Sequence, residues 1–349
     1  MEKFFKKEDL RKFIANYPAY APELVERVYT SRLIGADPGL VLHGGGNTSV
    51  KLCIKNIMGE AEEVLFVKGS GRDLANIDPE GFTGLRLEPL RKLRSLETLS
   101  AREMDNQLKI HRISAYSPDP SVEALLHAFL PHKYIDHTHG DSILILTNQK
   151  EAQEMLKQAL GTKIIVLPYI MSGLPLAKAV ADAYERTPDI EGIVIMNHGI
   201  FTFGENAETS YSRMTDYVNR ARDYIWERTE NKPLITPRKN LVHPVNLRSA
   251  LNRCAQVIRG ICAHQGADGK IARVYVESRN AIDLIEASLS QEAWEICRSG
   301  VLTPDHAIRT RNLMAFVELI PEDDIELKEM VTRATEAFKS DYLRYFHEH

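Results

Sequence analysis

Three histidines have the spacing and the neighbours of a metal site. His137 and His139 lie two residues apart, and His198 follows the apolar run 192–196. On a β-strand, residues i and i+2 point to the same face roughly 6–7 Å apart. Two imidazoles at that spacing can both reach one zinc ion at about 2.0–2.1 Å. A His-x-His pair alone is usually a packing or surface feature, but a third histidine after a buried strand favours metal binding.

Three protein ligands with a fourth position open are typical of catalytic rather than structural zinc. Imidazole ligands also suit Co²⁺, Mn²⁺ or Fe²⁺. The expected cofactor is therefore Zn²⁺, with these three ions as alternatives.

Two glycine-rich stretches could bind a phosphate or another oxyanion. Residues 42–49 contain Gly44, Gly45 and Gly46, and residues 67–72 contain a Gly-Ser-Gly sequence. Successive glycines let the backbone approach a ligand closely and turn its amides inward. One such stretch is usually only a turn, but two of them, each beside a predicted strand, favour an oxyanion site.

A carboxylate lies close to these candidates in the sequence. Glu123 comes two residues after Ser121, which is a good N-cap for a helix through Leu130. A helix N-terminus favours the ionised carboxylate. An ordinary first-turn glutamate would look the same, but this helix leads directly to His137, which makes Glu123 a candidate acid or base.

The hydrophobic pattern predicts alternating helices and strands that must position these residues. Helices are expected at 7–36, 85–113, 121–130, 151–160, 174–185 and 207–229. Strands are expected at 50–54, 64–67, 134–138, 143–146, 163–167, 192–196 and 200–203. The short connections after residues 138 and 196 favour hairpins, so we expect an α/β fold with a mixed, largely antiparallel sheet covered by helices.

A second, smaller region is expected after a proline-rich boundary. Residues 232–245 contain three prolines among polar neighbours, which predicts one domain over 1–231 and an α/β extension over 246–349. Within that extension we expect strands at 272–276 and 313–319 and a final helix over 322–346.

Composition narrows the class of protein. The chain has 349 residues, a net charge of −4 and four scattered cysteines. The length favours two domains, and the lack of basic bias argues against a nucleic-acid partner. Cysteines without a CxxC pair suggest a reducing, cytoplasmic location. No apolar run reaches the roughly 18 residues of a membrane span, so no membrane partner is expected.

Five short segments follow one another along the chain: Gly46–Ser49, Gly69–Gly71, Pro120–His127, His137–His139 and Asn197–Thr202. Their order and wording resemble the zinc-dependent class II aldolase/adducin family, which includes fuculose- and rhamnulose-1-phosphate aldolases. The chain resembles this family over about residues 20–230. It is especially similar to the aldolase half of bifunctional rhamnulose-1-phosphate aldolase/alcohol dehydrogenases, and the segment Thr303–Thr310 also resembles that group.

The resemblance implies a three-layer αβα fold and a role for each candidate residue. It places zinc on His137, His139 and His198, and makes Glu123 the catalytic acid/base. It implies substrate or phosphate contacts from Gly45, Gly46, Asn47, Ser70, Gly71 and Ser121. Val122 stands where many members have a second serine, which removes one possible phosphate donor. Epimerases of the family have aspartate where this chain has Glu123, so aldol chemistry is favoured.

The expected activity is reversible cleavage of a ketose 1-phosphate into dihydroxyacetone phosphate and an aldehyde. The resemblance also implies a homo-oligomer, commonly a tetramer, in which a neighbouring subunit often supplies a tyrosine as proton donor. His306 is the best candidate for a C-terminal contribution to the pocket, while His127 packs or hydrogen-bonds beneath it.

Several alternatives stay open at this stage. A sugar-acid phosphate decarboxylase or a methylthioribulose-phosphate dehydratase would use the same metal site. A non-catalytic adducin-like module is disfavoured because the three histidines and Glu123 are all present. An NAD-dependent oxidoreductase is disfavoured because no glycine-rich dinucleotide fingerprint opens a Rossmann unit. The chain is either a stand-alone aldolase or the aldolase portion of a longer product.

Overall fold

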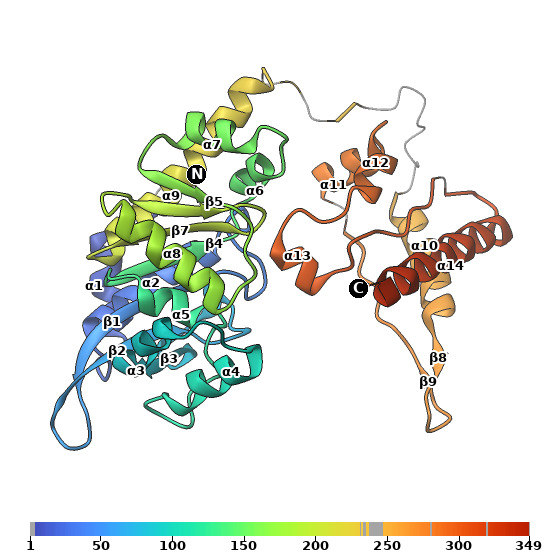
Figure 1. The fold of residues 1–349 in the computed structure, drawn as a ribbon. Coiled ribbons are helices and arrows are strands. Elements are labelled where there is room, and N and C mark those ends of the chain that lie inside the picture. The colour runs from blue at the N-terminus through green and yellow to red at the C-terminus, as the bar shows by residue number, and fades with distance from the viewer. Residues whose placement is uncertain are drawn as a thin grey trace. The chain divides into compact units, whose positions relative to one another are not determined.

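The computed structural model describes residues 4–230, 232, 235–236, 247–279, 281–318 and 320–348. The chain divides into two units (Figure 1). The first consists of Met1–Asn231 and Leu302–Arg309, and the second of Lys232–Val301 and Thr310–His349. The predicted boundary at 232–245 lies almost wholly outside the described residues.

A seven-stranded sheet forms the centre of the first unit. Its order is β3-β2-β1-β4-β7-β6-β5, and every neighbouring pair is antiparallel except β5 with β6. The strands are β1 (Asn47–Lys55), β2 (Ala61–Lys68), β3 (Phe82–Arg86), β4 (Tyr134–Thr138), β5 (Ile164–Leu167), β6 (Gly192–Ile195) and β7 (Gly199–Gly204). The prediction of a mixed, largely antiparallel sheet is confirmed.

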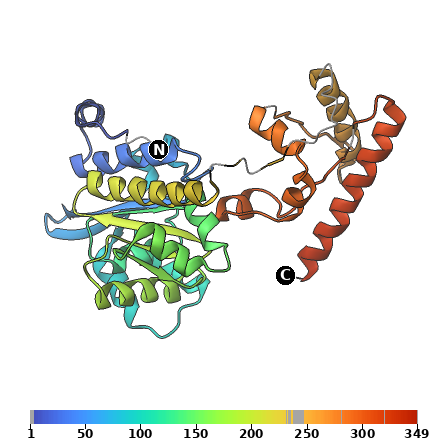
Figure 2. The same ribbon diagram turned by 90° about the horizontal axis from the view of Figure 1, so that it is seen from above.

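Helices cover both faces of this sheet, as Figure 2 shows. One buried apolar cluster joins the sheet to α2 (Pro22–Gly35), α6 (Asp141–Thr147), α7 (Ala152–Leu160) and α9 (Ala207–Arg228). A second cluster joins the other face to α3 (Leu87–Lys92), α4 (Ala101–Ile110), α5 (Ala124–Phe129) and α8 (Leu174–Arg186). The short α1 (Lys7–Ala15) packs against α2. The result is the expected three-layer αβα arrangement.

Two predictions near the candidate site are wrong. Residues 143–146 belong to the helix α6, not to a strand, so no hairpin follows β4. A short aliphatic run fits a buried helix as well as a strand, and periodicity alone does not separate them. The helix expected from Ser121 begins at Ala124, so Glu123 is its N-cap residue rather than a first-turn residue.

The second unit is helical rather than α/β. Its helices are α10 (Leu247–Cys262), α11 (Ile282–Ser288), α12 (Ala293–Arg298) and α14 (Asp324–Glu348), and the last confirms the predicted terminal helix. The expected strand at 272–276 is reduced to β9 (Ile271–Ala272), paired with β8 (His264–Gln265). Residues 313–318 form no strand, since an apolar run becomes a strand only where a partner strand satisfies its backbone.

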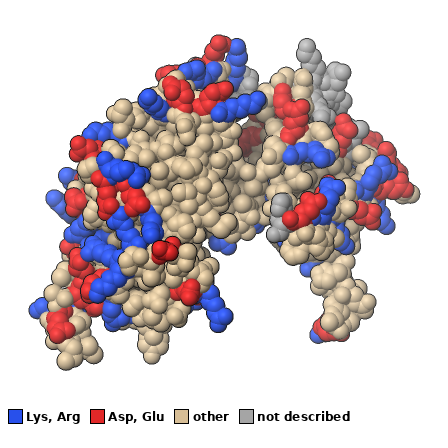
Figure 3. Space-filling view, in the orientation of Figure 1, with Lys and Arg blue, Asp and Glu red and all other residues tan. Residues whose placement is uncertain are grey.

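Two expectations from composition concern membrane-spanning helices and the distribution of charge on the surface. No helix in the described ranges is both long and apolar enough to cross a membrane. On the face shown in Figure 3, acidic and basic side chains are interspersed rather than gathered into one large area of a single sign.

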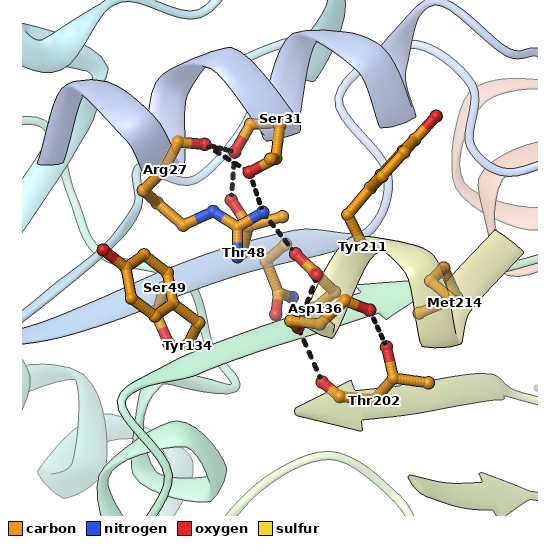
Figure 4. Close-up of polar contacts among 12 residues, drawn as sticks. Arg27, Ser31, Thr48, Ser49, Tyr134, Asp136, Thr202, Tyr211 and Met214 are labelled. Carbon is orange, nitrogen blue, oxygen red and sulfur yellow. Dashed lines mark hydrogen bonds and ion pairs between the residues drawn. The ribbon is translucent and has the colours of Figure 1, made fainter. Parts of the chain in front are cut away.

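A buried ion pair fixes β4 beneath α2 (Figure 4). Arg27 Nη2 lies 2.6 Å from Asp136 Oδ1, and neither side chain is exposed. Ser210 Oγ in α9 donates to Asp136 Oδ2 at 2.5 Å. Burial raises the pKa of Asp136, and Arg27 and Ser210 oppose that shift. Because α2 and α9 both hold Asp136, the face of β4 on which Asp136 lies is locked to the helical layer.

We expect removal of one member of this pair to destabilise the first unit strongly. Asp136→Ala leaves the Arg27 guanidinium buried without its counter-charge, which costs about 3–5 kcal/mol. Urea unfolding measures this when it is followed by Trp226 fluorescence in a Trp294→Phe background, because the chain has two tryptophans. Replacing both partners, as Arg27→Met with Asp136→Leu, is expected to recover most of the loss.

The matched control is the exposed i,i+4 pair of Glu8 and Lys12 in α1, whose charged atoms lie 2.9 Å apart. Lys12→Ala is expected to change the free energy of unfolding by less than about 1 kcal/mol. Equal effects of Lys12→Ala and Asp136→Ala would contradict the role given to the buried pair.

Candidate metal centre and active site

Neighbouring strands bring the three predicted histidines to one end of the sheet. His137 lies in β4, His139 follows the last residue of that strand, and His198 lies in the turn between β6 and β7. In the antiparallel registers, His137 pairs with Asn47 of β1 on one side and with Phe201 of β7 on the other. The first glycine loop and the β6–β7 turn therefore meet at the same end of β4.

Close approach of these two loops to β4 depends on glycine. Gly46 has φ of 55°, and a Cβ there would lie 2.6 Å from the carbonyl oxygen of His137. A Cβ on Gly199 would lie 2.3 Å from the carbonyl oxygen of Thr138. A side chain at either position would push its loop away from the histidines.

The three imidazoles converge on one point. One ring nitrogen from each of His137, His139 and His198 lies within 4.8 Å of the others, and all three residues are buried. The Nε2 atoms of His137 and His139 are 3.1 Å apart. The His137 ring also stacks on Phe201, with ring centroids 3.9 Å apart.

Hydrogen bonds at the other ring nitrogen set the tautomers of two of these rings. His137 Nδ1 lies 3.1 Å from the carbonyl oxygen of Ile200, and His139 Nδ1 lies 2.9 Å from Asp305 Oδ1. A carbonyl and a carboxylate only accept hydrogen bonds, so each Nδ1 carries a proton. Burial lowers the pKa of His137 well below its usual value, against the opposing influence of Glu123.

When both rings are neutral, the Nε2 atoms of His137 and His139 present lone pairs to each other. Two facing lone pairs at 3.1 Å repel each other, whereas a cation that both contact would be attracted to each. The donor set is three imidazole nitrogens, which are good ligands for zinc and related divalent ions. The residues present therefore fit a divalent metal ion.

Glu123 faces the same point from the N-terminus of α5. Its Oε1 lies 3.0 Å from His198 Nε2, and its Oε2 lies 3.4 Å from His137 Nε2. Burial by itself would raise the pKa of Glu123, but the two imidazoles and the Asn47 amide hold it well below its usual value. Glu123 is therefore a carboxylate at neutral pH.

A chain of buried hydrogen bonds orients this carboxylate. Asn47 Nδ2 donates to Glu123 Oε2 at 2.7 Å, and Asn47 Oδ1 lies 2.5 Å from His127 Nε2. Ser49 Oγ lies 2.7 Å from His127 Nδ1. Burial lowers the pKa of His127 to about 3, so this ring is neutral. It can donate from Nε2 to Asn47 and accept from Ser49, which fixes the Asn47 amide with its NH₂ group toward Glu123.

These groups lie at one side of a cavity of about 330 Å³. Its lining residues are Gly44, Gly45, Gly46, Asn47, Lys68, Ser70, Gly71, Ser121, Val122, Glu123, His139, Ser172, His198, Pro304, Asp305, Ile308 and Arg309. Nine of the ten predicted site residues line it, and the tenth, His137, is fully buried behind them.

Not every predicted contact has a free backbone amide. The Gly45 amide donates to the Leu42 carbonyl at 2.8 Å, and the Ser70 amide donates to the Asp119 carbonyl at 2.7 Å. Gly45 can therefore let a ligand approach the backbone closely, and Ser70 can offer its hydroxyl group. Neither offers the inward-turned amide expected from a glycine-rich loop.

Four charged or hydroxyl-bearing lining residues were not among the predicted site residues. Lys68 and Arg309 add positive charge, Ser172 Oγ donates to Glu123 Oε1 at 3.1 Å, and Asp305 contacts His139. His306, the predicted C-terminal contributor, does not line the cavity, and its Nδ1 lies 2.7 Å from Thr303 Oγ1. The segment Thr303–Thr310 does contribute to the cavity, but through Asp305 rather than through His306.

Lys68 joins the two glycine loops. Its Nζ donates to the carbonyl oxygens of Gly44 and Arg72, at 2.5 and 2.7 Å. An ammonium group has three donors, so one N–H remains for a ligand in the cavity. Burial lowers the pKa of Lys68 to about 8, against the opposing influence of Asp305. The residue is only 2% exposed, so its charge acts mainly on the cavity.

We expect the cavity to bind anions more weakly as the pH rises through about 8. Lys68 is an ammonium below that pKa and neutral above it. Sulfate keeps its charge throughout, so its affinity should fall about tenfold between pH 7 and pH 9 as the lysine loses its proton. Isothermal titration calorimetry with sulfate measures this change.

Lys68→Met should weaken sulfate binding at pH 7 and remove most of the pH dependence. Lys92→Met is the matched control, because Lys92 is a 73% exposed lysine paired with Glu88 in α3. A pH profile for Lys68→Met that follows the unmodified chain would show that another group binds the anion.

Comparison with known protein families agrees with this architecture. Residues 25–225 match the family model "Class II Aldolase and Adducin N-terminal domain", and residues 249–349 match "Aldolase class II, second domain". The chain is 32% identical over 332 residues to "Uncharacterized oxidoreductase YuxG" of Bacillus subtilis (strain 168). That match covers 94% of this chain and 47% of the relative, so the chain spans about half of the relative's length.

Solved structures also resemble part of the chain. The N-terminal class II aldolase domain of a conserved protein from Thermoplasma acidophilum is 41% identical, with a TM-score of 0.56. The match covers 59% of this chain and 95% of that domain. A sugar-phosphate aldolase from Thermotoga maritima is 16% identical with a TM-score of 0.47, covering 64% of this chain and 98% of that one.

Proposed function

The chain belongs to the class II aldolase and adducin family, whose aldolases are lyases, and on this basis we propose that it is a zinc-dependent sugar-phosphate aldolase. The proposed reaction is reversible cleavage of a ketose 1-phosphate into dihydroxyacetone phosphate and an aldehyde. A substrate of the rhamnulose-1-phosphate type is proposed from the sequence resemblance around Glu123 and the histidines. The observation that carries the proposal is the convergence of three imidazoles and Glu123 at one side of a cavity that also contains Lys68.

In the proposed site, His137, His139 and His198 hold the zinc ion through their converging ring nitrogens. When bound, the ion supplies Lewis acidity toward the ketone oxygen and the adjacent hydroxyl oxygen of the substrate, a contribution of several kcal/mol. The protein's part is to hold His137 and His139 in one orientation and one tautomer, which Ile200 and Asp305 do at the two Nδ1 atoms.

Glu123 is proposed to move the proton at the donor carbon. In condensation, its carboxylate takes the proton from the carbon next to the ketone, and the electron pair left there forms the new carbon–carbon bond. In cleavage, that bond breaks, its electron pair stays with the donor fragment, and Glu123 returns the proton there. The hydroxyl group on the departing carbon gives its proton to water or to the tyrosine that the family resemblance implies, and so becomes the aldehyde. In condensation the same group returns a proton to the aldehyde oxygen. The hydrogen bonds from Asn47 and Ser172 hold the carboxylate in place during both directions.

The other side of the cavity is proposed to hold the substrate phosphate. Lys68 offers a charged donor, Ser70 offers a hydroxyl group from the second glycine loop, and Ser121 offers another from the segment before α5. Fixing the phosphate there fixes the reacting carbon relative to Glu123, and orientation of this kind can account for a large part of a rate enhancement. The proposed partner is therefore a small phosphorylated sugar.

The experiment that tests the proposal combines metal analysis with cleavage assays. Purified protein is expected to contain one zinc per chain and to release dihydroxyacetone phosphate from a ketose 1-phosphate in a chelator-sensitive way. Fuculose, rhamnulose, ribulose and 5-deoxyribulose 1-phosphates make a suitable panel. Bound zinc without cleavage of any of them would favour the decarboxylase or dehydratase alternative. No metal, even after zinc is supplied, would overturn the assignment of the three histidines.

Glu123→Gln is expected to keep the metal and lose proton exchange. The amide preserves shape but cannot take a proton, and a positioned general base contributes about 10²–10⁴-fold. The measurement is exchange of the donor-carbon proton of dihydroxyacetone phosphate in deuterated water, followed by NMR. Glu154→Gln in α7 is the control, since Glu154 is exposed. Exchange at the unmodified rate in Glu123→Gln would show that another group is the base.

The family resemblance also leads us to propose a homo-oligomer, commonly a tetramer, with active sites at subunit interfaces. Light scattering coupled to size exclusion measures the mass directly, and a monomer of about 39.5 kDa would exclude it.

A further inference from the structure

A residue far along the chain forms part of the histidine cluster. Asp305 belongs to α13 (Pro304–Arg309), which lies within the first unit although the chain on either side of it belongs to the second. The side chain is 4% exposed. Its Oδ1 lies 2.9 Å from His139 Nδ1, and its Oδ2 accepts a hydrogen bond from the Leu42 amide at 2.9 Å.

Each carboxylate oxygen of Asp305 therefore accepts one hydrogen bond. Oδ1 holds the proton of His139 at Nδ1, which leaves Nε2 as the lone-pair atom toward His137. Oδ2 holds the start of the first glycine loop through Leu42. Only a carboxylate presents two acceptor atoms in this way, because an amide group has one acceptor and one donor.

The glycine loop is shaped to admit this carboxylate. A Cβ on Gly45 would lie 1.7 Å from Asp305 Oδ1 and 2.5 Å from Oδ2. Gly45 is not among the glycines with positive φ, so its backbone would tolerate alanine. The space that glycine leaves at this position is therefore filled by Asp305.

We propose that Asp305 is a positioning residue of the metal centre, which orients His139 and fixes its tautomer for metal binding. This inference rests on the metal site of the proposed function. A metal-bound histidine commonly donates its other N–H to a carboxylate, and loss of that carboxylate typically weakens metal binding 10–100-fold. Because Asp305 falls within the match to the second family domain, residues 249–349, that domain supplies part of the site.

The test is zinc affinity of the full chain, measured without substrate by competition with a chromogenic chelator. Asp305→Asn is expected to bind zinc about 10–100-fold more weakly, because asparagine cannot accept from both His139 and Leu42. Asp37→Asn is the matched control, since Asp37 accepts from the Gly39 amide in the same region and, among the described residues, has no hydrogen bond or ion pair with a histidine. An affinity of Asp305→Asn within about twofold of the unmodified chain would overturn the inference.

A second variant tests the same geometry with every polar group left in place. Gly45→Ala should displace Asp305 and so reproduce its loss, seen as weaker zinc binding and as an altered visible absorption spectrum of the Co²⁺-substituted protein. In an Asp305→Ala background, Gly45→Ala should have no further effect on either readout. Additive effects of the two substitutions would contradict the proposed coupling.

The outcome separates this inference from the proposed function. Zinc binding that weakens in Asp305→Asn, in a chain that cleaves none of the sugar phosphates, would uphold the positioning role and overturn the aldolase proposal. Efficient cleavage by the unmodified chain, with unchanged zinc affinity in Asp305→Asn, would uphold the aldolase proposal and overturn the positioning role of Asp305.

Discussion

The ion pair between Arg27 and Asp136 is the constraint from which the site is built. Successive residues of a strand face opposite sides of the sheet, so locking Asp136 to α2 and α9 turns the next residue, His137, to the other side. The antiparallel registers then set Asn47 and Phe201 beside His137. One buried contact on the far face of β4 thereby determines where the imidazole, the first glycine loop and the β6–β7 turn meet.

The central elements of the fold and most of the site could be predicted because they depend on local patterns. The strands expected at 50–54 and 64–67 lie in β1 and β2, and the hairpin expected after residue 196 is the pair β6–β7. The three histidines converge as their spacing indicated, although His139 lies just beyond β4 rather than in it. Glycine at positions 46 and 199 is explained by the lack of room for any side chain beside β4.

What the sequence left out depends on contacts between distant residues. Nothing near Asp305 in the sequence indicates that it pairs with His139, 166 residues away. Lys68 could be seen in the second glycine stretch, but its burial between Gly44 and Arg72 becomes visible only when β2 is placed beside the first loop. The run 143–146 was wrongly predicted as a strand because a short aliphatic run fits either a strand or a buried helix. Its packing against α9, which goes with the helix, is visible only in the tertiary structure. Local patterns identified the chemistry, and tertiary contacts determine which groups position it.

The distance along the chain between His139 and Asp305 also determines how long after His139 the carboxylate becomes available during translation. At about 5–20 residues per second, the 166 residues that separate them take on the order of ten to thirty seconds to translate. In the later part of that interval, once β6, His198 and β7 have been made, the nascent chain has all three histidines but not Asp305, and Gly45 borders a gap. The proposed metal centre is therefore complete only after the layer that contains it has been made, when the late segment Leu302–Arg309 joins the first unit.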